Sequence, residues 1–212
     1  MFPAFYRTKD VQQSPIRHAE GDVFVHTLMV LDAVKDKISP SEKKFKPLVD
    51  KHDLILIIFA AMYHDTGKRE RNLLSTEENK IDHVRESIKH AKNDLAKYLS
   101  EEDLDIVVEM IQKHETIHGD QLSYRVNKLF KLFSLRKNLE SGLLLLKFSE
   151  SDLLGRKIAE GHEDIWDKNM AILDRNVEIY EILSNIEDQG QSFPIQHVSA
   201  DILEKIKKLV NF

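Results

Sequence analysis

The chain has 212 residues, with 31 Lys and Arg against 36 Asp and Glu, which gives a formal net charge of −5 with neutral histidines. Its 42% hydrophobic and 32% charged residues are typical of a globular protein and exclude a disordered chain. The absence of Cys excludes a disulfide framework, a Cys-ligated metal site and a Cys nucleophile. Only 7 Gly and 5 Pro occur, where average usage predicts about 15 and about 11. Because an all-β fold needs many tight turns, we predict an all-α fold.

The N-terminal part of the chain contains two strongly apolar segments. Residues 1–20 show no helical periodicity, and their prolines disfavour a helix there. Asp22 can cap a helix over residues 23–38, in which apolar residues occupy nearly the whole circumference. A second helix, over residues 54–63, is equally apolar, and Gly67 is expected to act as its C-terminal stop. Helices that are apolar all round belong in the middle of a bundle.

The rest of the chain alternates polar connections and helical patterns. Residues 69–80 are polar and are expected to form a loop, whereas Ser100 and Asp103 form a capping-box-like helix start. Helices are expected over residues 83–98, 101–115, 122–137, 139–155, 164–186 and 199–210. Since no repeat and no Gly/Ser/Pro linker divides the chain, we predict one helical bundle over residues 10–157, with residues 158–212 as a C-terminal helical appendage packed on it.

Two further patterns concern location and partners. The N-terminus lacks a charged start followed by a long apolar run, so no signal peptide is expected. The longest apolar stretch, residues 55–63, is far shorter than the ~20 residues that span a bilayer. A mildly acidic chain with mixed charges also argues against duplex nucleic acid as a partner. We therefore expect a cytoplasmic protein without membrane contact; its oligomeric state is left open.

Histidines and aspartates recur at the ends of the apolar helices. His64 and Asp65 end the most apolar helix, His26 lies inside the other, and Asp152 lies near the end of a third. A buried carboxylate costs several kcal/mol unless a cation or good donors compensate, and a divalent metal satisfies imidazole and carboxylate together. A single core histidine is more often a hydrogen-bonded structural residue, so the repeated arrangement carries the argument. The candidate metal ligands are His26, His64, Asp65, His83, His114 and Asp152.

Together, these segments resemble a known family. They are residues 20–27 (EGDVFVHT), residues 64–68 (HDTGK), His83, His114 and residues 149–156 (SESDLLGR). In this order they resemble the HD-domain superfamily of metal-dependent phosphohydrolases. The last segment and the opening HAEGD of residues 18–22 are most similar to the HD domain of bacterial CCA-adding tRNA nucleotidyltransferases. The resemblance covers residues 10–157, so this is the expected HD domain.

The resemblance implies a role for each matching residue. His26, His64, Asp65 and Asp152 would hold a first metal ion, and His83 and His114 would belong to a second in dinuclear relatives. Asp65 would also be catalytic, by bridging the two ions. Lys68 would be catalytic and face the substrate phosphate. Arg156 matches the Arg of the last motif and is a further substrate-binding candidate. Three more are suggested by the residues alone: Arg69 and Arg125 by their charge, and His118 because it follows His114 by four residues on one helix face.

The implied activity is hydrolysis of a phosphoester by a metal-activated water. One or two ions of Mn²⁺, Co²⁺, Ni²⁺, Fe²⁺ or Zn²⁺ suit a site of imidazoles and carboxylates, and Mg²⁺ suits it less because it prefers oxygen ligands. The expected partner is a small phosphorylated substrate: a phosphomonoester, a nucleotide or a 2′,3′-cyclic phosphodiester.

Two alternatives stay open beside this activity. One is a non-catalytic HD module that binds a nucleotide or a protein partner around a structural metal, and the other is an alarmone-type nucleotide hydrolase. CCA addition is not implied, since no polymerase motif is recognisable. A cyclic-di-GMP phosphodiesterase is not expected either, because its Gly-Tyr-Pro signature is missing after His114 and Glu115.

Overall fold

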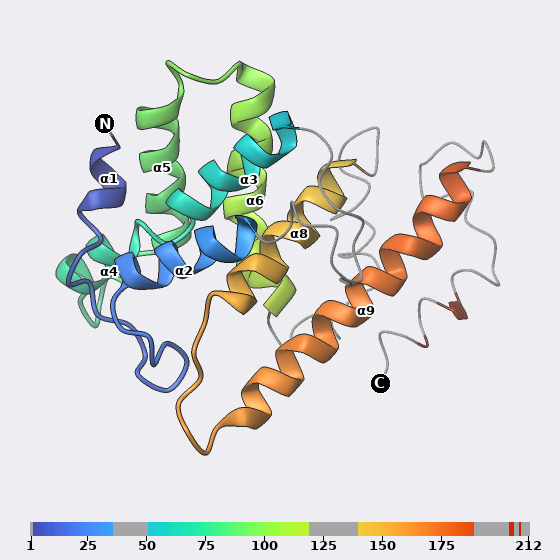
Figure 1. The fold of residues 1–212 in the computed structure, drawn as a ribbon. Coiled ribbons are helices and arrows are strands. Elements are labelled where there is room, and N and C mark those ends of the chain that lie inside the picture. Colours follow the sequence, from blue (N-terminus) through green and yellow to red (C-terminus); the bar gives the residue numbers. More distant parts are fainter. Residues whose placement is uncertain (1, 36–50, 119–139, 189–203, 206–207, 209–212) are drawn as a thin grey trace.

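The described part of the protein consists of helices and their connections. The computed structural model describes residues 2–35, 51–118, 140–188, 204–205 and 208. Within these residues there is no strand, which confirms the predicted all-α fold. The helices are α1 (Pro3–Tyr6), α2 (Val23–Lys35), α3 (Lys51–Tyr63), α4 (Lys68–Leu74), α5 (His83–Leu95), α6 (Glu101–His118), α8 (Glu140–Leu154) and α9 (Glu163–Asp188), as Figure 1 shows.

Two predicted helix starts are confirmed by their capping hydrogen bonds. The Asp22 carboxylate accepts from the backbone N–H of Val25 at 2.8 Å, at the start of α2. The Ser100 hydroxyl accepts from the backbone N–H of Asp103 at 3.1 Å, at the start of α6. The predicted helices over residues 122–137 and 199–210 lie outside the described residues, apart from three positions in the second.

Two predictions of irregular structure were wrong. Residues 3–6 form the short helix α1, because Pro3 occupies its first turn, where a missing N–H costs nothing. Residues 68–74 form α4 within the segment that was expected to be a loop. Both helices are too short to show a hydrophobic period, which explains why the pattern missed them.

Gly67 does not act as a C-terminal stop. Its backbone is in the ordinary right-handed region, with φ −73°, and it caps the start of α4. A Cβ built at this position would lie 2.1 Å from the carbonyl oxygen of His83. The glycine is therefore required because the start of α5 approaches the turn after α3 this closely. The turn is tied to α5 by the Gly67 N–H, which donates to the Ser87 hydroxyl at 2.9 Å.

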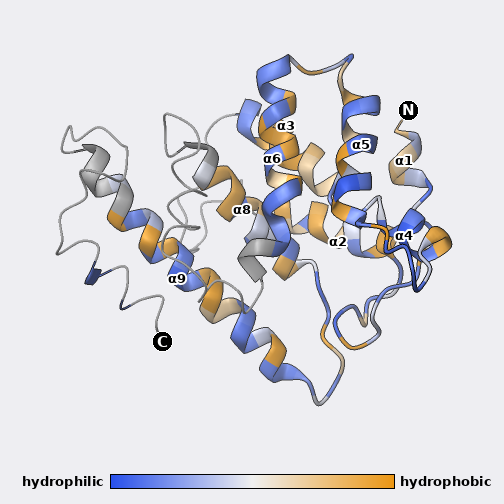
Figure 2. Ribbon diagram, turned by 180° about the vertical axis from the view of Figure 1, so that it is seen from behind, coloured by the Kyte–Doolittle hydropathy of each residue, from blue (hydrophilic) through white to orange (hydrophobic). Residues whose placement is uncertain are grey.

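The core lies where α2, α3, α6 and α8 pack on one another. Helix α3 contacts α2, α5, α6 and α8, so it is the central helix, as its apolar circumference predicts. Figure 2 shows hydrophobic residues gathered along α8 and on α3 and α6. Fully buried side chains from these helices include Leu56, Ile57, Met110, Ile111 and Phe148. Among the described residues, no helix is both long and apolar enough to cross a membrane.

The long helix α9 packs on α8 and α6 through Leu173, Val177 and Ile179, which join the same core. It runs along one side of the bundle in Figure 1. The segment 158–188 therefore packs on the bundle. The division of the chain at residue 157 stays a prediction.

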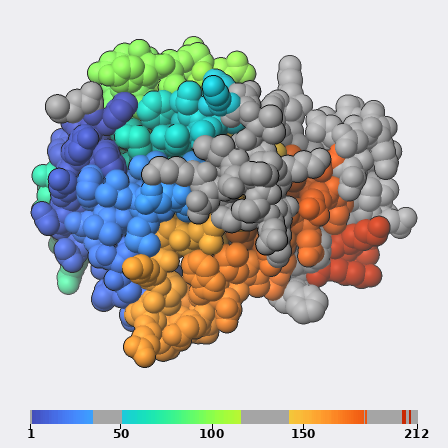
Figure 3. All heavy atoms as spheres, viewed as in Figure 1, coloured from blue at the N-terminus to red at the C-terminus, as the bar shows by residue number. Residues whose placement is uncertain are grey.

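Two loops meet beside the start of α2. The backbone N–H of Ala19 donates to the carbonyl of Lys157 at 2.8 Å, and the N–H of Ala159 donates to the carbonyl of Ile16 at 2.9 Å. In Figure 3 the N-terminal segment and the segment after α8 lie next to each other on the surface. These bonds fix the loop before α2 against the end of α8.

Candidate metal centre

The six predicted ligands are brought together by the bundle. Each lies at or near the end of a helix, or in the turn after one, and all are buried; His83, the most exposed, is 7% exposed. They are His26 on α2, His64 and Asp65 in the turn after α3, His83 at the start of α5, His114 on α6 and Asp152 on α8. Residues separated by up to 126 positions thus share one buried site.

The first group of potential ligands is His26, His64 and Asp152. Their candidate ligand atoms all lie within 4.8 Å of one another. The Asp152 Oδ1 atom is 3.0 Å from His26 Nε2 and 3.5 Å from His64 Nε2. Two imidazole nitrogens and one carboxylate oxygen at these separations could hold one divalent ion.

The second group is Asp65, His83 and His114, with ligand atoms again within 4.8 Å of one another. The Asp65 Oδ1 atom is 3.6 Å from His83 Nε2 and 3.9 Å from His114 Nε2. The other oxygen of the same carboxylate, Oδ2, is 3.3 Å from His64 Nε2. Asp65 therefore lies between the two groups, with one oxygen facing each.

The hydrogen bonds of the histidines orient their other nitrogens into the site. His64 Nδ1 is 2.8 Å from the carbonyl oxygen of Ala61, and His114 Nδ1 is 2.6 Å from that of Ile111. Because a carbonyl oxygen only accepts, each Nδ1 must carry the proton. In the neutral ring, the lone pair is then on Nε2, which faces the carboxylates. Metal-binding histidines usually have this arrangement.

Among the described residues, three buried atoms in the centre have no hydrogen-bond partner, although the nearest carboxylate or imidazole atoms lie 3.3–3.6 Å away. They are His64 Nε2, Asp65 Oδ1 and His83 Nε2. An unsatisfied buried polar atom costs about 1–3 kcal/mol, and a single bound ion could satisfy all three together. The donor set of nitrogen and oxygen atoms fits a divalent transition ion.

Burial and charge act against each other at this site. Burial alone would lower the pKa of His64, but the carboxylates of Asp65 and Asp152 outweigh it and raise that pKa to about 10. Asp65 is buried as well, yet the Lys68 ammonium and the His64 imidazole hold the pKa of its carboxyl well below the usual range. His114 has a pKa lowered to about 4, first by burial and then by the neighbouring His64 charge.

Lys68 and Arg156 each contact one carboxylate of the centre. The Lys68 ammonium donates to Asp65 Oδ2 and to Gln13 Oε1, both at 2.6 Å. The Arg156 guanidinium donates to Asp152 Oδ2, on the opposite side of that carboxylate from the histidines. Both cations thus hold a carboxylate of the centre in place while contributing positive charge to it.

The remaining substrate-binding candidates differ in position. The Arg69 side chain pairs with Glu70 at 3.5 Å, and within the described part of the chain it makes no hydrogen bond or ion pair with the centre. His118 is the last residue of α6, and its side chain lies outside the described part. Arg125 also lies outside the described residues.

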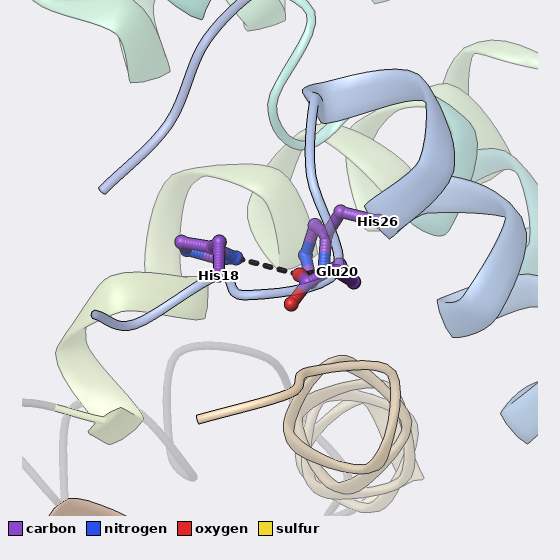
Figure 4. A group of neighbouring side chains, drawn as sticks. All are labelled: His18, Glu20 and His26. Atoms are coloured by element: carbon purple, nitrogen blue, oxygen red, sulfur yellow. Dashed lines mark hydrogen bonds and ion pairs between the residues drawn. The ribbon is translucent and has the colours of Figure 1, made fainter. Parts of the chain in front are cut away.

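Four residues without a predicted role border the centre. Gln13 accepts from Lys68, and the exposed Glu115 has Oε1 3.3 Å from His83 Nε2. His18 and Glu20 lie in the loop before α2, and Figure 4 shows His18 and His26 both directed toward Glu20. The HAEGD segment of this loop contributes to the family resemblance, but nothing in its spacing predicted a contact with His26.

Comparisons with protein-family models, with curated proteins and with solved structures give no match for this chain.

Proposed function

We propose that this protein is a divalent-metal-dependent phosphohydrolase of the HD type. Its substrate class would be small phosphorylated molecules: phosphomonoesters, nucleotides or 2′,3′-cyclic phosphodiesters. The observation that carries the proposal is the convergence of six buried histidines and aspartates into two groups, in each of which the ligand atoms lie within 4.8 Å of one another.

The donor set limits the chemistry of the ion. Four imidazoles and two carboxylates, without a thiolate, suit Mn²⁺, Co²⁺, Ni²⁺, Fe²⁺ or Zn²⁺. His26, His64, Asp152 and Asp65 would hold one ion, and Asp65, His83 and His114 a second. A divalent ion in such a site supplies Lewis acidity, which polarises a phosphoryl oxygen and lowers the pKa of water.

The protein's own residues would contribute positioning and charge. Asp65 presents one oxygen to each group of ligands, so it would set how far apart the two groups of ligand atoms lie. The Lys68 ammonium is next to this carboxylate and keeps positive charge where a phosphate would gather negative charge. Because the site is buried, this attraction is stronger than it would be in water.

A screen of phosphoesters with the metal-reconstituted protein tests the proposal, with the candidate metals assayed one at a time. We expect hydrolysis that EDTA abolishes and that His64→Ala or Asp65→Ala removes together with metal binding. The variant His162→Ala is the control, because His162 is exposed in the connection before α9. Metal binding without hydrolysis of any phosphoester would contradict the catalytic proposal and favour a non-catalytic module with a structural metal.

The role of Lys68 is tested separately. We expect Lys68→Ala to lower kcat/KM by about 10²–10³-fold, the usual cost of removing one charge-stabilising donor, while metal still binds. Steady-state kinetics of this variant are compared with those of Lys80→Ala, which changes an exposed lysine. Equal kcat/KM in the two variants would show that Lys68 does not act on the substrate.

A further inference from the structure

Glu20 is a buried carboxylate that three nitrogen atoms approach to within 2.9 Å. Its side chain is 1% exposed. The Oε1 atom is 2.9 Å from His18 Nδ1 and 2.9 Å from His26 Nδ1, and Oε2 accepts from the backbone N–H of Lys157 at 2.8 Å. Figure 4 shows the two imidazoles reaching this carboxylate from different directions. The loop before α2, α2 itself and the segment after α8 therefore meet at Glu20.

The contact between Glu20 and His26 bears on which nitrogen of His26 carries the proton and which faces the metal centre. His26 Nδ1 has two oxygen neighbours, Glu20 Oε1 at 2.9 Å and the carbonyl of Gly155 at 3.3 Å. A carbonyl oxygen only accepts, and an ionised carboxylate does the same, so Nδ1 carries the proton. His26 Nε2 then points to Asp152 Oδ1, at 3.0 Å, and into the first group of ligands.

The acceptors of His26 Nδ1 come from outside its own helix, namely Glu20 and the Gly155 carbonyl. His64 and His114 donate to the carbonyl three residues earlier, Ala61 and Ile111 respectively. The corresponding carbonyl for His26 is that of Val23, and it accepts from the Thr27 hydroxyl at 2.9 Å. For His26, the Glu20 side chain from the preceding loop, at 2.9 Å, and the Gly155 carbonyl, at 3.3 Å, therefore take the place of the helix carbonyl that serves the other two histidines.

We propose that Glu20 is a positioning residue for the metal centre. It holds His26 with the proton on Nδ1 and the lone pair of Nε2 directed at the ion, and His18 and the Lys157 N–H hold Glu20 in turn. This inference rests on the metal centre of the proposed function, but not on the reaction. Carboxylates that orient a metal-binding histidine usually change metal affinity by about 10–100-fold when they are removed.

The same three residues, His18, Glu20 and His26, could also be considered a separate metal site, since their ligand atoms lie within 4.8 Å of one another. Hydrogen-bond chemistry favours the positioning role. A neutral imidazole has one lone pair, so His26 cannot bind one ion through Nδ1 and another through Nε2. Because His26 also belongs to the central group with His64 and Asp152, its Nδ1 is left to donate to Glu20.

The test measures Zn²⁺ affinity of the full chain by competition with a chelator of known affinity. Glu20→Ala is expected to bind Zn²⁺ about 10–100-fold more weakly than the unchanged protein. Glu20→Gln keeps an oxygen acceptor and is expected to lose less. Glu77→Gln, at an exposed position after α4, is the matched control and is expected to change nothing. If Glu20→Ala does not fold, the affinity of Glu20→Gln decides.

A second readout separates positioning from a purely structural role. In the Zn²⁺-loaded, ¹⁵N-labelled protein, the Nδ1–H signal of His26 is expected to be protected from solvent exchange, and Glu20→Ala is expected to lose that protection. His18→Ala is expected to leave the number of bound ions unchanged. A loss of one ion in His18→Ala would instead establish a separate site and overturn the positioning role.

The outcomes distinguish this inference from the proposed function. If the unchanged protein binds Zn²⁺ and both Glu20 variants bind it equally well, the positioning role is wrong while the metal centre stands. If the unchanged protein binds neither Zn²⁺ nor any other of the candidate ions, the positioning role and the proposed function are both wrong. If Glu20→Ala weakens Zn²⁺ binding but no phosphoester is hydrolysed, the positioning role is supported and the catalytic proposal alone is contradicted.

Discussion

His64 lies between two carboxylates in a buried site, and this determines its protonation without metal. Asp65 Oδ2 and Asp152 Oδ1 lie 3.3 and 3.5 Å from its Nε2. Although burial lowers its pKa, these carboxylates raise it to about 10, so the imidazole carries a positive charge at neutral pH. The proton therefore occupies the position that a metal ion would take.

Metal binding at neutral pH is therefore expected to release a proton from His64. A group with a raised pKa is protonated below that pKa, and a metal ion must displace the proton. Between pH 7 and 9, the apparent affinity is expected to rise about tenfold per pH unit for one displaced proton. Calorimetric titration in buffers of different ionisation enthalpy measures the release.

The variant His162→Ala, at an exposed position, is the control for this measurement. On binding metal it is expected to release the same number of protons as the unchanged protein. His114 adds none at neutral pH, since its pKa is lowered to about 4 by burial and the His64 charge. Binding heats that do not depend on the buffer would contradict the protonated state of His64.

The metal centre depends on the close approach of helices α2 and α8. A Cβ built at Gly155 would lie 2.6 Å from the backbone nitrogen of Val30 and 2.7 Å from its Cα. Backbone atoms cannot move aside as the end of a flexible side chain can, so only glycine fits. This contact allows Asp152, one turn earlier in the chain, to reach His26.

Gly155→Ala is expected to force α2 and α8 apart. Overpacking of this kind costs about 1–3 kcal/mol, which denaturant unfolding measures, and Zn²⁺ affinity is expected to fall with it because Asp152 moves from His26. Gly161→Ala is the control. Gly161 has φ +83° with open space around it, so alanine there costs about 1–2 kcal/mol of backbone strain but leaves Zn²⁺ affinity unchanged. Equal Zn²⁺ affinities in both variants would contradict this role of the contact.

Long apolar helices were predictable from the sequence, and so was the position of the ligands at their ends. His64 and Asp65 follow a helix without a polar face, so their burial follows from the pattern. The contact of Glu20 with His26 was not predictable, because it depends on the Val23 carbonyl being used by Thr27. The role of Gly67 was likewise missed, since it depends on how closely α5 approaches the turn.

The centre connects most of the helical bundle. Its ligands come from α2, α5, α6 and α8 and from the turn after α3. A ligand that binds only the folded chain stabilises it by mass action. An ion held by these residues would therefore oppose separation of helices that are distant in sequence.

Bound Zn²⁺ is expected to raise the unfolding temperature. At a free Zn²⁺ concentration of 100 times the Kd, the gain is about 2.7 kcal/mol, which corresponds to about 5–10 °C in Tm for a chain of this length. Thermal unfolding in Zn²⁺ and in EDTA measures the difference. Asp65→Ala is expected to show no such difference, and a Zn²⁺-dependent rise in that variant would place the ion elsewhere.

The shared position of Asp65 has a consequence for the order of filling. Its two oxygens belong to one rigid carboxylate, so an ion drawn to the Oδ2 side withdraws negative charge from the Oδ1 side, which faces His83 and His114. A second ion would then meet a weaker attraction and the repulsion of the first. Stepwise titration with metal would show two unequal dissociation constants, because the first and second groups of ligands cannot bind their ions independently.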